Sequence, residues 1–171
     1  GTRLAILPGH PLRTSVRDVA RNGLTALETT ESKRLNLDAA LPEPFQDALL
    51  SELEGSHCGM MPKSAFGNMA MAQRYRDAHM ADALVLATEM NGSAILFAGN
   101  GHVRTDRGVP YYWRERKDKP VAAVMLVEHE AGDIDIPRTP DGTWAADYVI
   151  LTARAKRTDP CEEMRAMSGK K

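Results

Sequence analysis

The sequence predicts an α/β fold, a Rossmann-like layered sheet with helices together with a small all-helical subdomain. Two short apolar runs, residues 94–98 and 121–127, are typical of strands that are buried on both faces. Longer segments repeat apolar residues at steps of three and four, which is the helical period. Strands that alternate with helices indicate a layered α/β fold, and residues 10–62 carry helical patterns alone.

The domain organisation follows from this order. We predict that residues 1–9 supply one strand of the α/β core, residues 10–62 the helical subdomain, and residues 63–171 the rest of the core. The chain has 171 residues, which is enough for one domain with a substantial core. It opens inside what reads as a strand, so we expect a fragment of a longer protein.

The composition argues against two classes of protein. Charged residues make up 26% of the chain and the formal net charge is −1, whereas nucleic-acid-binding proteins are usually basic. Basic residues gather at 104–119 and 154–157, and such clusters are more typical of a solvated face than of a binding patch. No apolar run approaches the ~20 residues of a transmembrane helix. Because the net charge is close to zero, we expect no nucleic-acid partner.

A strand and a helix are predicted to open the chain. The apolar run of residues 4–7 is ended by a Pro-Gly pair, as a strand before a turn would be. Thr14 or Ser15 is suited to cap a helix that extends to about Leu27, because a hydroxyl can accept a hydrogen bond from the first turn. Residues 28–43 are mostly polar and are predicted to form short turns.

Two further helices flank a glycine-containing loop. Residues 44–53 repeat leucine and phenylalanine at helical spacing. Residues 55–59, Gly-Ser-His-Cys-Gly, interrupt that pattern and predict a loop. A long helix rich in alanine and methionine is predicted from Ser64 or Phe66 to Met90, where an Asn-Gly pair follows as a favourable C-cap.

The second half of the chain is predicted to supply most of the sheet. Its expected order is a strand at residues 94–98, a short helix at 109–117 with Pro110 in its first turn, a strand at 121–127, a loop at 133–143, a strand at 148–151, and a charged tail from residue 154.

The most informative loop reads Gly-Asn-Gly-His and directly follows residues 94–98. In open α/β sheets ligands bind beyond the carboxyl ends of the strands, and glycine lets the backbone approach a ligand closely. We therefore predict that Asn100 and His102 line a ligand cleft. A tight turn with a surface histidine is the alternative. The GxGxxG spacing of dinucleotide sites is absent.

The long helix carries two polar residues on an otherwise apolar stripe. Gln73 and Asp77 lie one turn apart and share a face with Met69 and Met80. A buried polar group costs free energy unless it is paired. Gln73 and Asp77 therefore either pair with each other and with nearby backbone, or line a site. Arg74 falls on another face and is expected to be solvated.

His57 and Cys58 form a second candidate. A loop histidine beside a thiol is able to bind a metal or act as a general base, although no CxxC or HxxxH spacing completes a zinc site. A loop residue in a tight turn is the alternative. Cys58 and Cys161 are the two cysteines, and they can pair only if the fold brings them together.

Several stretches match one known family. Residues 56–62 (SHCGMMP) are similar to a loop motif of that family, and residues 72–81 (AQRYRDAHMA) to its AQxxRDAxMA helix. Residues 98–110 (AGNGHVRTDRGVP) are similar to its GNGHVRxDxGVP signature, and residues 147–161 resemble its C-terminal end. On these motifs the chain resembles the ChaN-like haem-binding uptake proteins, relatives of the Tiki and TraB proteins.

The resemblance implies an α/β domain with a helical subdomain, haem as cofactor, and a role in bacterial iron uptake at the cell envelope, often as a lipoprotein. Family members can bind haem between two monomers, with a tyrosine on the iron and histidine and lysine groups near the propionates. A homodimer and envelope transport machinery are therefore the implied partners. The family also begins with a strand and a Gly-Glu-x-His-Asp-like motif, which does not precede Leu4.

The first functional hypothesis is a haem-binding protein of haem and iron uptake. Haem would lie in a cleft at the carboxyl edge of the sheet. Arg104 would pair with a propionate, and the remaining candidate ligand-binding residues are His102, His57, Gln73, Asp77 and Asn100.

The second hypothesis is a metal-dependent, peptidase-like hydrolase. Residues 99–102 fit the Gly-x-x-His motif of the Tiki relatives. His102 would then bind a divalent metal ion or act as a base, with Glu128 or Asp77 as its carboxylate partner. A structural or interaction domain is the third possibility, and it would leave the candidate side chains far apart.

Overall fold

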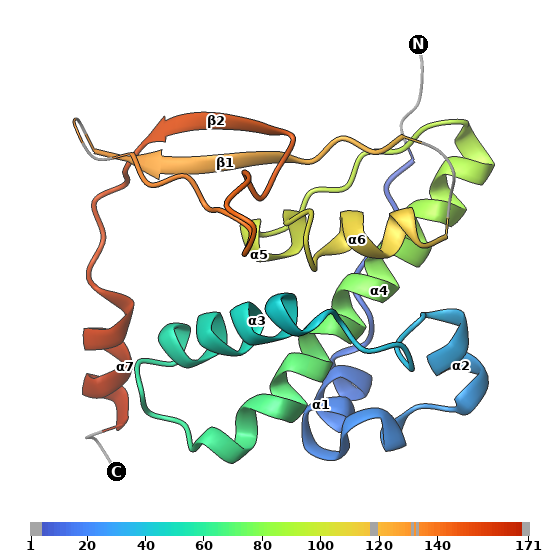
Figure 1. Cartoon of the computed structure of the whole chain (residues 1–171), viewed down its shortest axis with the longest axis horizontal. Coiled ribbons are helices and arrows are strands. Elements are labelled where there is room, and N and C mark those ends of the chain that lie inside the picture. The colour runs from blue at the N-terminus through green and yellow to red at the C-terminus, as the bar shows by residue number, and fades with distance from the viewer. Residues whose placement is uncertain (1–4, 117–119, 131, 133, 169–171) are drawn as a thin grey trace.

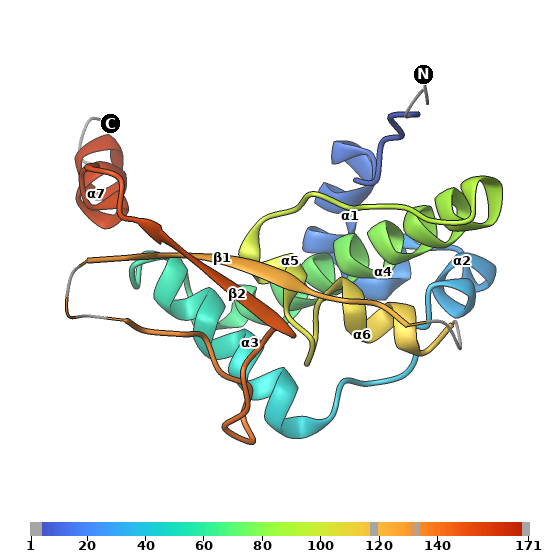
Figure 2. The same ribbon diagram turned by 90° about the horizontal axis from the view of Figure 1, so that it is seen from above.

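The computed structural model describes residues 5–116, 120–130, 132 and 134–168. Figures 1 and 2 show a body of helices with two strands along one side and a C-terminal helix set apart. The elements are α1 (Arg13–Asn22), a 3-10 turn (Gly23–Ala26), α2 (Thr29–Arg34), α3 (Glu43–Ser56), a second 3-10 turn (Lys63–Ala65), α4 (Phe66–Asn91), α5 (Asn100–Val103), α6 (Val109–Arg114), β1 (Val124–His129), β2 (Tyr148–Ala153) and α7 (Pro160–Ser168).

Helix α4 is the central element of the helical body, and α1, α3 and α6 pack against it (Figure 1). Its small alanines let neighbouring helices approach closely, and Ala78 and Ala81 are fully buried. The core around α4 also contains Val19, Leu35 and Leu37 from the segments before it. Residues of the predicted helical subdomain thus share one core with α4, and the division into subdomains stays a prediction.

Most helices lie where the sequence predicts them, and α4 ends as expected. Gly92 adopts φ +77°, and its N–H donates to the carbonyl of Thr88 at 2.8 Å. Two details differ. Helix α1 begins at Arg13 without a side-chain cap, so neither Thr14 nor Ser15 caps it. Helix α2 occupies part of the segment predicted as turns, because Leu35 and Leu37 anchor it in the core.

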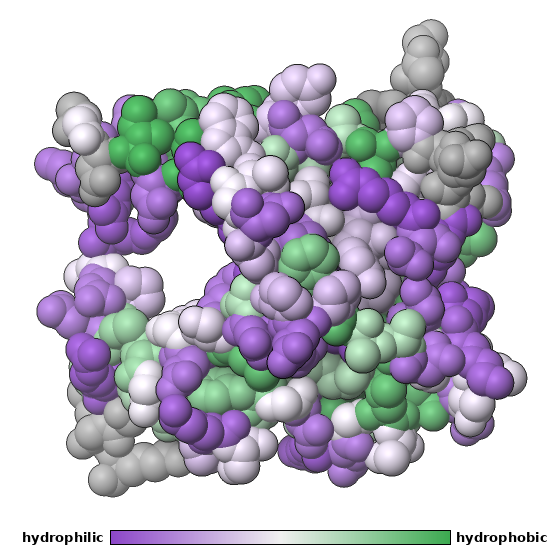
Figure 3. All heavy atoms as spheres, viewed as in Figure 1, coloured by the Kyte–Doolittle hydropathy of each residue, from purple (hydrophilic) through white to green (hydrophobic). Residues whose placement is uncertain are grey.

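The mixed α/β composition is confirmed, and the sheet among the described residues consists of two parallel strands. Strands β1 and β2 pair from Val124 with Tyr148 to His129 with Ala153. Met125 and Val127 of β1 are buried, whereas Leu126 is exposed. One face of the pair therefore packs inward, and the prediction that residues 121–127 are buried on both faces is wrong. The other forms part of the apolar surface seen over β1 and β2 in Figure 3. The Rossmann-like layered sheet stays a prediction.

Two predicted strands are wrong. Residues 5–7 and 94–98 adopt no strand pairing, and residue 4 lies outside the described range. Phe97 is 92% exposed and Ile95 is 83% exposed, so residues 94–98 are not buried on both faces. Their alternate residues Leu96 and Ala98 pack against the α4 core. An apolar run does not by itself indicate whether both of its faces are buried, because burial depends on which segments pack beside it.

A disulfide joins Cys58, just after α3, to Cys161 in the first turn of α7. The two Cα atoms are 5.6 Å apart although the cysteines are 103 residues apart in sequence. Figure 3 shows an open gap between α7 and the strands on this face. The disulfide is therefore a major attachment of α7 to the rest of the chain.

Within the part of the chain that the structure describes, no helix combines the length and the hydropathy that crossing a bilayer requires.

Candidate functional site

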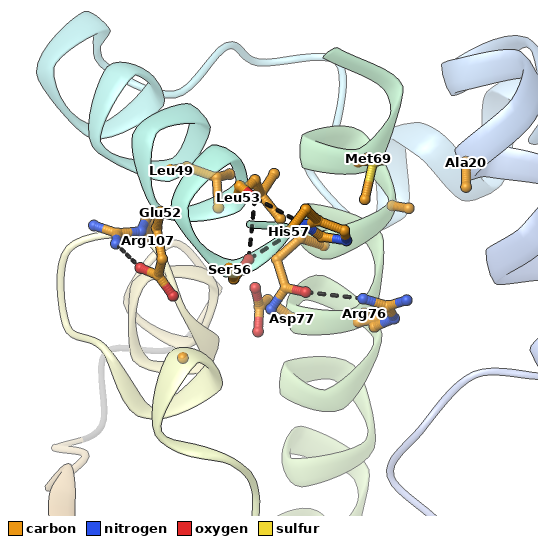
Figure 4. A pocket seen from close by; sticks show the side chains of 13 residues that line it. Ala20, Leu49, Glu52, Leu53, Ser56, His57, Met69, Arg76, Asp77 and Arg107 are labelled. Atoms are coloured by element: carbon orange, nitrogen blue, oxygen red, sulfur yellow. Dashed lines mark hydrogen bonds and ion pairs between the residues drawn. The ribbon is translucent and has the colours of Figure 1, made fainter. Parts of the chain in front are cut away.

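A cavity of about 340 Å³ lies among α1, α3, α4 and the start of α5 (Figure 4). Apolar side chains from α1, α3 and α4 form part of its lining, and seven polar or charged side chains complete it. It is lined by Ala20, Leu49, Glu52, Leu53, Ser56, His57, Met69, Ala72, Gln73, Arg76, Asp77, Gly101 and Arg107. The volume lies in the ~300–1,000 Å³ range of small-molecule sites.

Asp77 and His102 form a hydrogen-bonded pair between α4 and α5. The Nδ1 atom of His102 lies 2.6 Å from Oδ1 of Asp77, and only 2% of Asp77 is exposed. Since a carboxylate is a strong acceptor, the Nδ1 proton points to Asp77 and Nε2 is left as the free nitrogen. The amide nitrogen of Gln73 lies 3.0 Å from the same Nδ1 atom, and its Oε1 accepts a 2.9 Å hydrogen bond from Arg76.

Burial raises the pKa of Asp77 from 3.8 to about 6, because removal from water disfavours the carboxylate. The hydrogen bond with His102 opposes this shift, as do electrostatic interactions with His102, Arg76 and Arg107. Asp77 pairs with His102, and Gln73 accepts a hydrogen bond from Arg76. Neither residue therefore depends on the other as its partner. They connect α4 to α5 at the wall of the cavity.

Gly108 fixes the path of the chain that leaves α5. A Cβ atom at this position would lie 2.4 Å from the carbonyl oxygen of His102 and 2.7 Å from that of Arg104. Its N–H donates to the Arg104 carbonyl at 3.0 Å. Only glycine fits so close an approach, so the Gly-Val-Pro part of the motif holds the α5 segment that carries His102.

His57 lines the same cavity and lies at the C-terminus of α3. Its Nδ1 atom is 2.7 Å from the carbonyl oxygen of Leu53, and its ring makes an edge contact with Phe66. Hydrogen bonding at Nδ1 selects the tautomer in which Nε2 carries a lone pair. Histidines that bind metals are commonly held in this way through the other ring nitrogen.

Glu52 and Arg107 close one side of the cavity and were not predicted. Arg107 is 5% exposed. It pairs with Glu52 of α3 and donates to Asp106 at 2.7 Å. No sequence motif marks Glu52, since it lies on the polar side of an ordinary amphipathic helix. Arg107 lies within the GNGHVRxDxGVP stretch, and this motif is the sequence signal that could have identified it as a site residue.

Arg104 belongs to a structural cluster rather than to the cavity lining. Its guanidinium donates to both carboxylate oxygens of Asp106, at 3.0 and 2.9 Å, and to the carbonyl of Arg138 at 2.7 Å. The group is buried and its hydrogen-bonding capacity is largely used. The prediction of a solvated face for residues 104–119 is therefore wrong at Arg104 and Arg107, because both pair with a buried carboxylate.

Arg74 is also buried, contrary to the prediction that it is solvated. It is 5% exposed and donates from Nε to the hydroxyl of Tyr112 at 2.9 Å. Burial raises the pKa of Tyr112 to about 12. Arg74 thus joins α4 to α6, and the apolar spacing of α4 did not reveal this because the partner lies 38 residues away.

Asn100 and Glu128 lie outside the cavity. The side chain of Asn100 donates to the carbonyl of Leu126 at 2.6 Å and so ties α5 to β1. Glu128, at the end of β1, pairs with Arg157. The cavity is walled by helices, and the ligand cleft at the carboxyl edge of the sheet stays a prediction.

A second, more open depression adjoins the cavity, and the two share Ala20 and Arg76. Its volume is about 570 Å³. We call it the arginine groove, and its lining residues are His10, Arg13, Val16, Arg17, Ala20, Arg76 and His102. His102 is the member that the sequence predicted. The arginines of α1 were missed because a basic helix face is usually only solvated.

The described residues hold no group of three or more His, Cys, Asp or Glu side chains arranged to bind a metal ion. The candidate ligands are therefore separate imidazoles: His57 lines the cavity and His102 lines the arginine groove.

A family model covers the part of the chain that forms the cavity and the groove. The model described as haem-binding uptake, Tiki superfamily, ChaN matches residues 3–113, about two thirds of the chain. It ends before β1, so the resemblance of residues 147–161 stays a prediction. No curated protein and no solved structure matches the chain. The extent of the family match shows that the chain belongs to the ChaN family of haem-binding uptake proteins in the Tiki superfamily.

Proposed function

We propose that the protein binds haem in the cavity between α3 and α4 and serves as a haem carrier in bacterial iron uptake. The observation that carries this proposal is the position of His57. Its Nδ1 atom is held by the Leu53 carbonyl, and its ring lines a cavity with Leu49 and Met69. This arrangement leaves Nε2 available beside apolar side chains.

The residues present fit haem in three respects. Apolar side chains provide contact area for a flat macrocycle, which buries most of its surface in such sites. The imidazole of His57 would hold the iron of haem through Nε2, and bound haem would supply that iron as the acceptor. The adjoining arginine groove offers positive charge to carboxylates. Asp77 would orient His102 at the border between cavity and groove, with Gln73 beside the pair.

A titration with haemin, followed by absorbance, tests the proposal. We expect a saturable shift of the Soret band in the wild type and at least about tenfold weaker binding in His57→Ala, since tenfold corresponds to ~1.4 kcal/mol. His102→Ala should weaken binding less, because His102 lies in the groove. His129→Ala is the matched control, since His129 lies on β1 away from the cavity.

The absence of any saturable Soret band in wild type would refute the proposal. Equal affinities of wild type and His57→Ala would leave haem binding in place and show that His57 is not the ligand.

The disulfide supports a location in the bacterial envelope. Disulfides such as Cys58–Cys161 form and persist mainly in oxidising compartments, including the periplasm. The proposal that the protein works outside the cytoplasm therefore predicts an oxidised Cys58–Cys161 pair in protein extracted from cells with free thiols blocked.

The pairing of Asp77 with His102 favours one alternative function. A histidine oriented by a buried carboxylate can act as a general base, and His102 ends the Gly-x-x-His motif of a metal-dependent hydrolase. A stoichiometric divalent metal in the purified protein, together with peptide cleavage that EDTA abolishes, would support this alternative over the haem carrier.

A further inference from the structure

We infer that the outer side of β1 and β2, together with residues 94–98, is a surface through which two copies of this chain associate without haem. We call this surface the strand patch. Its members are exposed apolar side chains from three segments: Ile95, Phe97, Val124, Leu126, Tyr148 and Ile150. The inference does not rest on the proposed function, because none of these side chains lines the cavity or the arginine groove.

The two strands expose one apolar face. Val124 pairs with Tyr148, and Leu126 pairs with Ile150. Residues that are paired in this way point to the same face of a sheet. Leu126 is 55% exposed and Ile150 is 52% exposed, whereas Met125 on the opposite face is buried. Among the described residues, the outer face therefore lacks the second layer against which an apolar sheet face usually packs.

Residues 94–98 add a second exposed apolar stretch. Leu96 and Ala98 pack against the core around α4. Ile95 and Phe97 alternate with them and are almost fully exposed. The inner side of this segment is thus held by the helical body, while its outer side presents two large apolar side chains.

This segment is tied to β1 but does not pair with it. The side chain of Asn100, just beyond the segment, donates to the carbonyl of Leu126 at 2.6 Å. Figures 1 and 2 show that residues 94–98 and β1 run in the same direction. The backbone of residues 94–98 makes no hydrogen bond to other backbone groups of the described residues. Since unpaired backbone groups are a template for another chain, a partner can add hydrogen bonds to the apolar contact.

The surface of the chain is larger than its mass predicts. A folded monomer of 18.8 kDa should expose ~8,300 Å² by the scaling of area with mass. The accessible surface of this chain is 11435 Å². The difference of about 3,100 Å² exceeds the ~800 Å² that a stable interface removes from each partner. The chain therefore has enough excess surface to bury in an interface of that size.

The chemistry of the strand patch fits a second copy of the chain. A two-fold axis places the same surface of both subunits in contact, so a charged surface would repel itself. The members of the patch are all uncharged, and Glu128 at the end of β1 is paired with Arg157. Phe97 and Tyr148 are aromatic side chains of the kind that contributes most to interfaces. Two copies can thus pack face to face, as the sheets of a sandwich do.

Sedimentation equilibrium of the haem-free protein tests the inference. We expect wild type to show twice the chain mass of 18.8 kDa. Phe97→Glu and Leu126→Glu each place a charge in the patch, and each should raise the dissociation constant of the dimer at least about thirtyfold. Met167→Glu is the matched control, because Met167 is equally apolar and exposed but belongs to α7. Circular dichroism checks that the variants fold.

Amide hydrogen exchange of wild type is a second measurement that needs no variant. Exchange at residues 94–98 should slow as the protein concentration rises, because association covers this segment. Exchange in α7 should not change with concentration. Exchange at residues 94–98 that is independent of concentration would contradict the inference even if the variants failed to fold.

A monomeric wild type, or a dimer that Phe97→Glu and Leu126→Glu leave intact, would overturn the inference. Binding of monomeric wild type to phosphatidylcholine vesicles would also overturn it, by assigning the strand patch to lipid. A dimer that forms only after haemin is added would do the same, because a pair linked by haem would meet at the cavity. The haemin titration is read separately, so failure of this inference leaves the proposed function standing.

Discussion

Asp77 places a carboxylate on the packed side of α4, and only 2% of the residue is exposed to solvent. Its hydrogen bond to His102 and the nearby arginines offset only part of the desolvation, so its pKa rises to about 6. The unfolded chain would titrate this group near 3.8. Between about pH 4 and pH 6 the folded protein therefore binds more protons at Asp77 than the unfolded protein does.

Asp77→Asn should change how stability depends on pH. In wild type, the contribution of Asp77 to the free energy of unfolding should fall as the pH rises from about 4 to about 6. The total loss should be about 3 kcal/mol, at 1.36 kcal/mol for each pKa unit. Asp77→Asn should lack this loss. Urea unfolding at pH 4.5 and pH 7.5 measures it, with Asp47→Asn on the exposed side of α3 as control. Identical pH dependence in wild type and Asp77→Asn would contradict the prediction.

At the scale of elements, α4 organises both the core and the site. One face of the helix buries Ala78 and Ala81, while the side toward α3 and α5 presents Gln73 and Asp77. The end of α4 is set by Gly92, whose φ of +77° reverses the chain toward residues 94–98. A residue with a side chain is strained in this conformation.

Gly92→Ala should lower the free energy of unfolding by about 1–2 kcal/mol, because the left-handed conformation is costly for alanine. No atom lies within 4 Å of a Cβ at this position, so strain rather than a clash is the cause. Gly55→Ala is the control: its site in α3 is equally open and helical, so it should be neutral or stabilise by ~0.5–1 kcal/mol. Equal effects of the two substitutions in urea unfolding would argue against the assigned cause.

At the scale of the whole molecule, the Cys58–Cys161 disulfide connects the cavity region to α7. Cys58 directly follows His57, so the same bond that holds α7 also restrains the backbone beside the proposed iron ligand. It closes a loop across most of the chain, with a sequence separation of 103 residues. Closing so long a loop restricts the unfolded chain strongly.

Removing the disulfide in a Cys58→Ser and Cys161→Ser variant should lower the free energy of unfolding by up to about 4–5 kcal/mol, the value of the chain-entropy model for a loop of about 100 residues. Thermal unfolding with and without a reductant measures it. Reductant should reproduce the effect in wild type and change nothing in the double variant. A wild-type melting temperature that reductant leaves unaltered would show that the bond does not contribute.

Local patterns along the chain are sufficient to predict several of its elements. The alanine-rich pattern of α4, its Asn-Gly end, the helix after Gly108 and the two strands β1 and β2 all follow from spacing and turn chemistry. The placement of Gln73 and Asp77 on one stripe and of His102 after an apolar run also came from local patterns. These were enough to predict a mixed α/β chain and to identify its family.

Which surfaces are covered and which charges are paired depends on contacts between distant segments of the chain. Residues 94–98 are apolar throughout, yet Ile95 and Phe97 are exposed because no segment among the described residues covers them. Arg104 and Arg13 look alike in sequence, but one is held by Asp106 and the other faces an open groove. The cysteines pair across 103 residues. Each outcome depends on distances between segments far apart in the chain, and local sequence does not encode those distances.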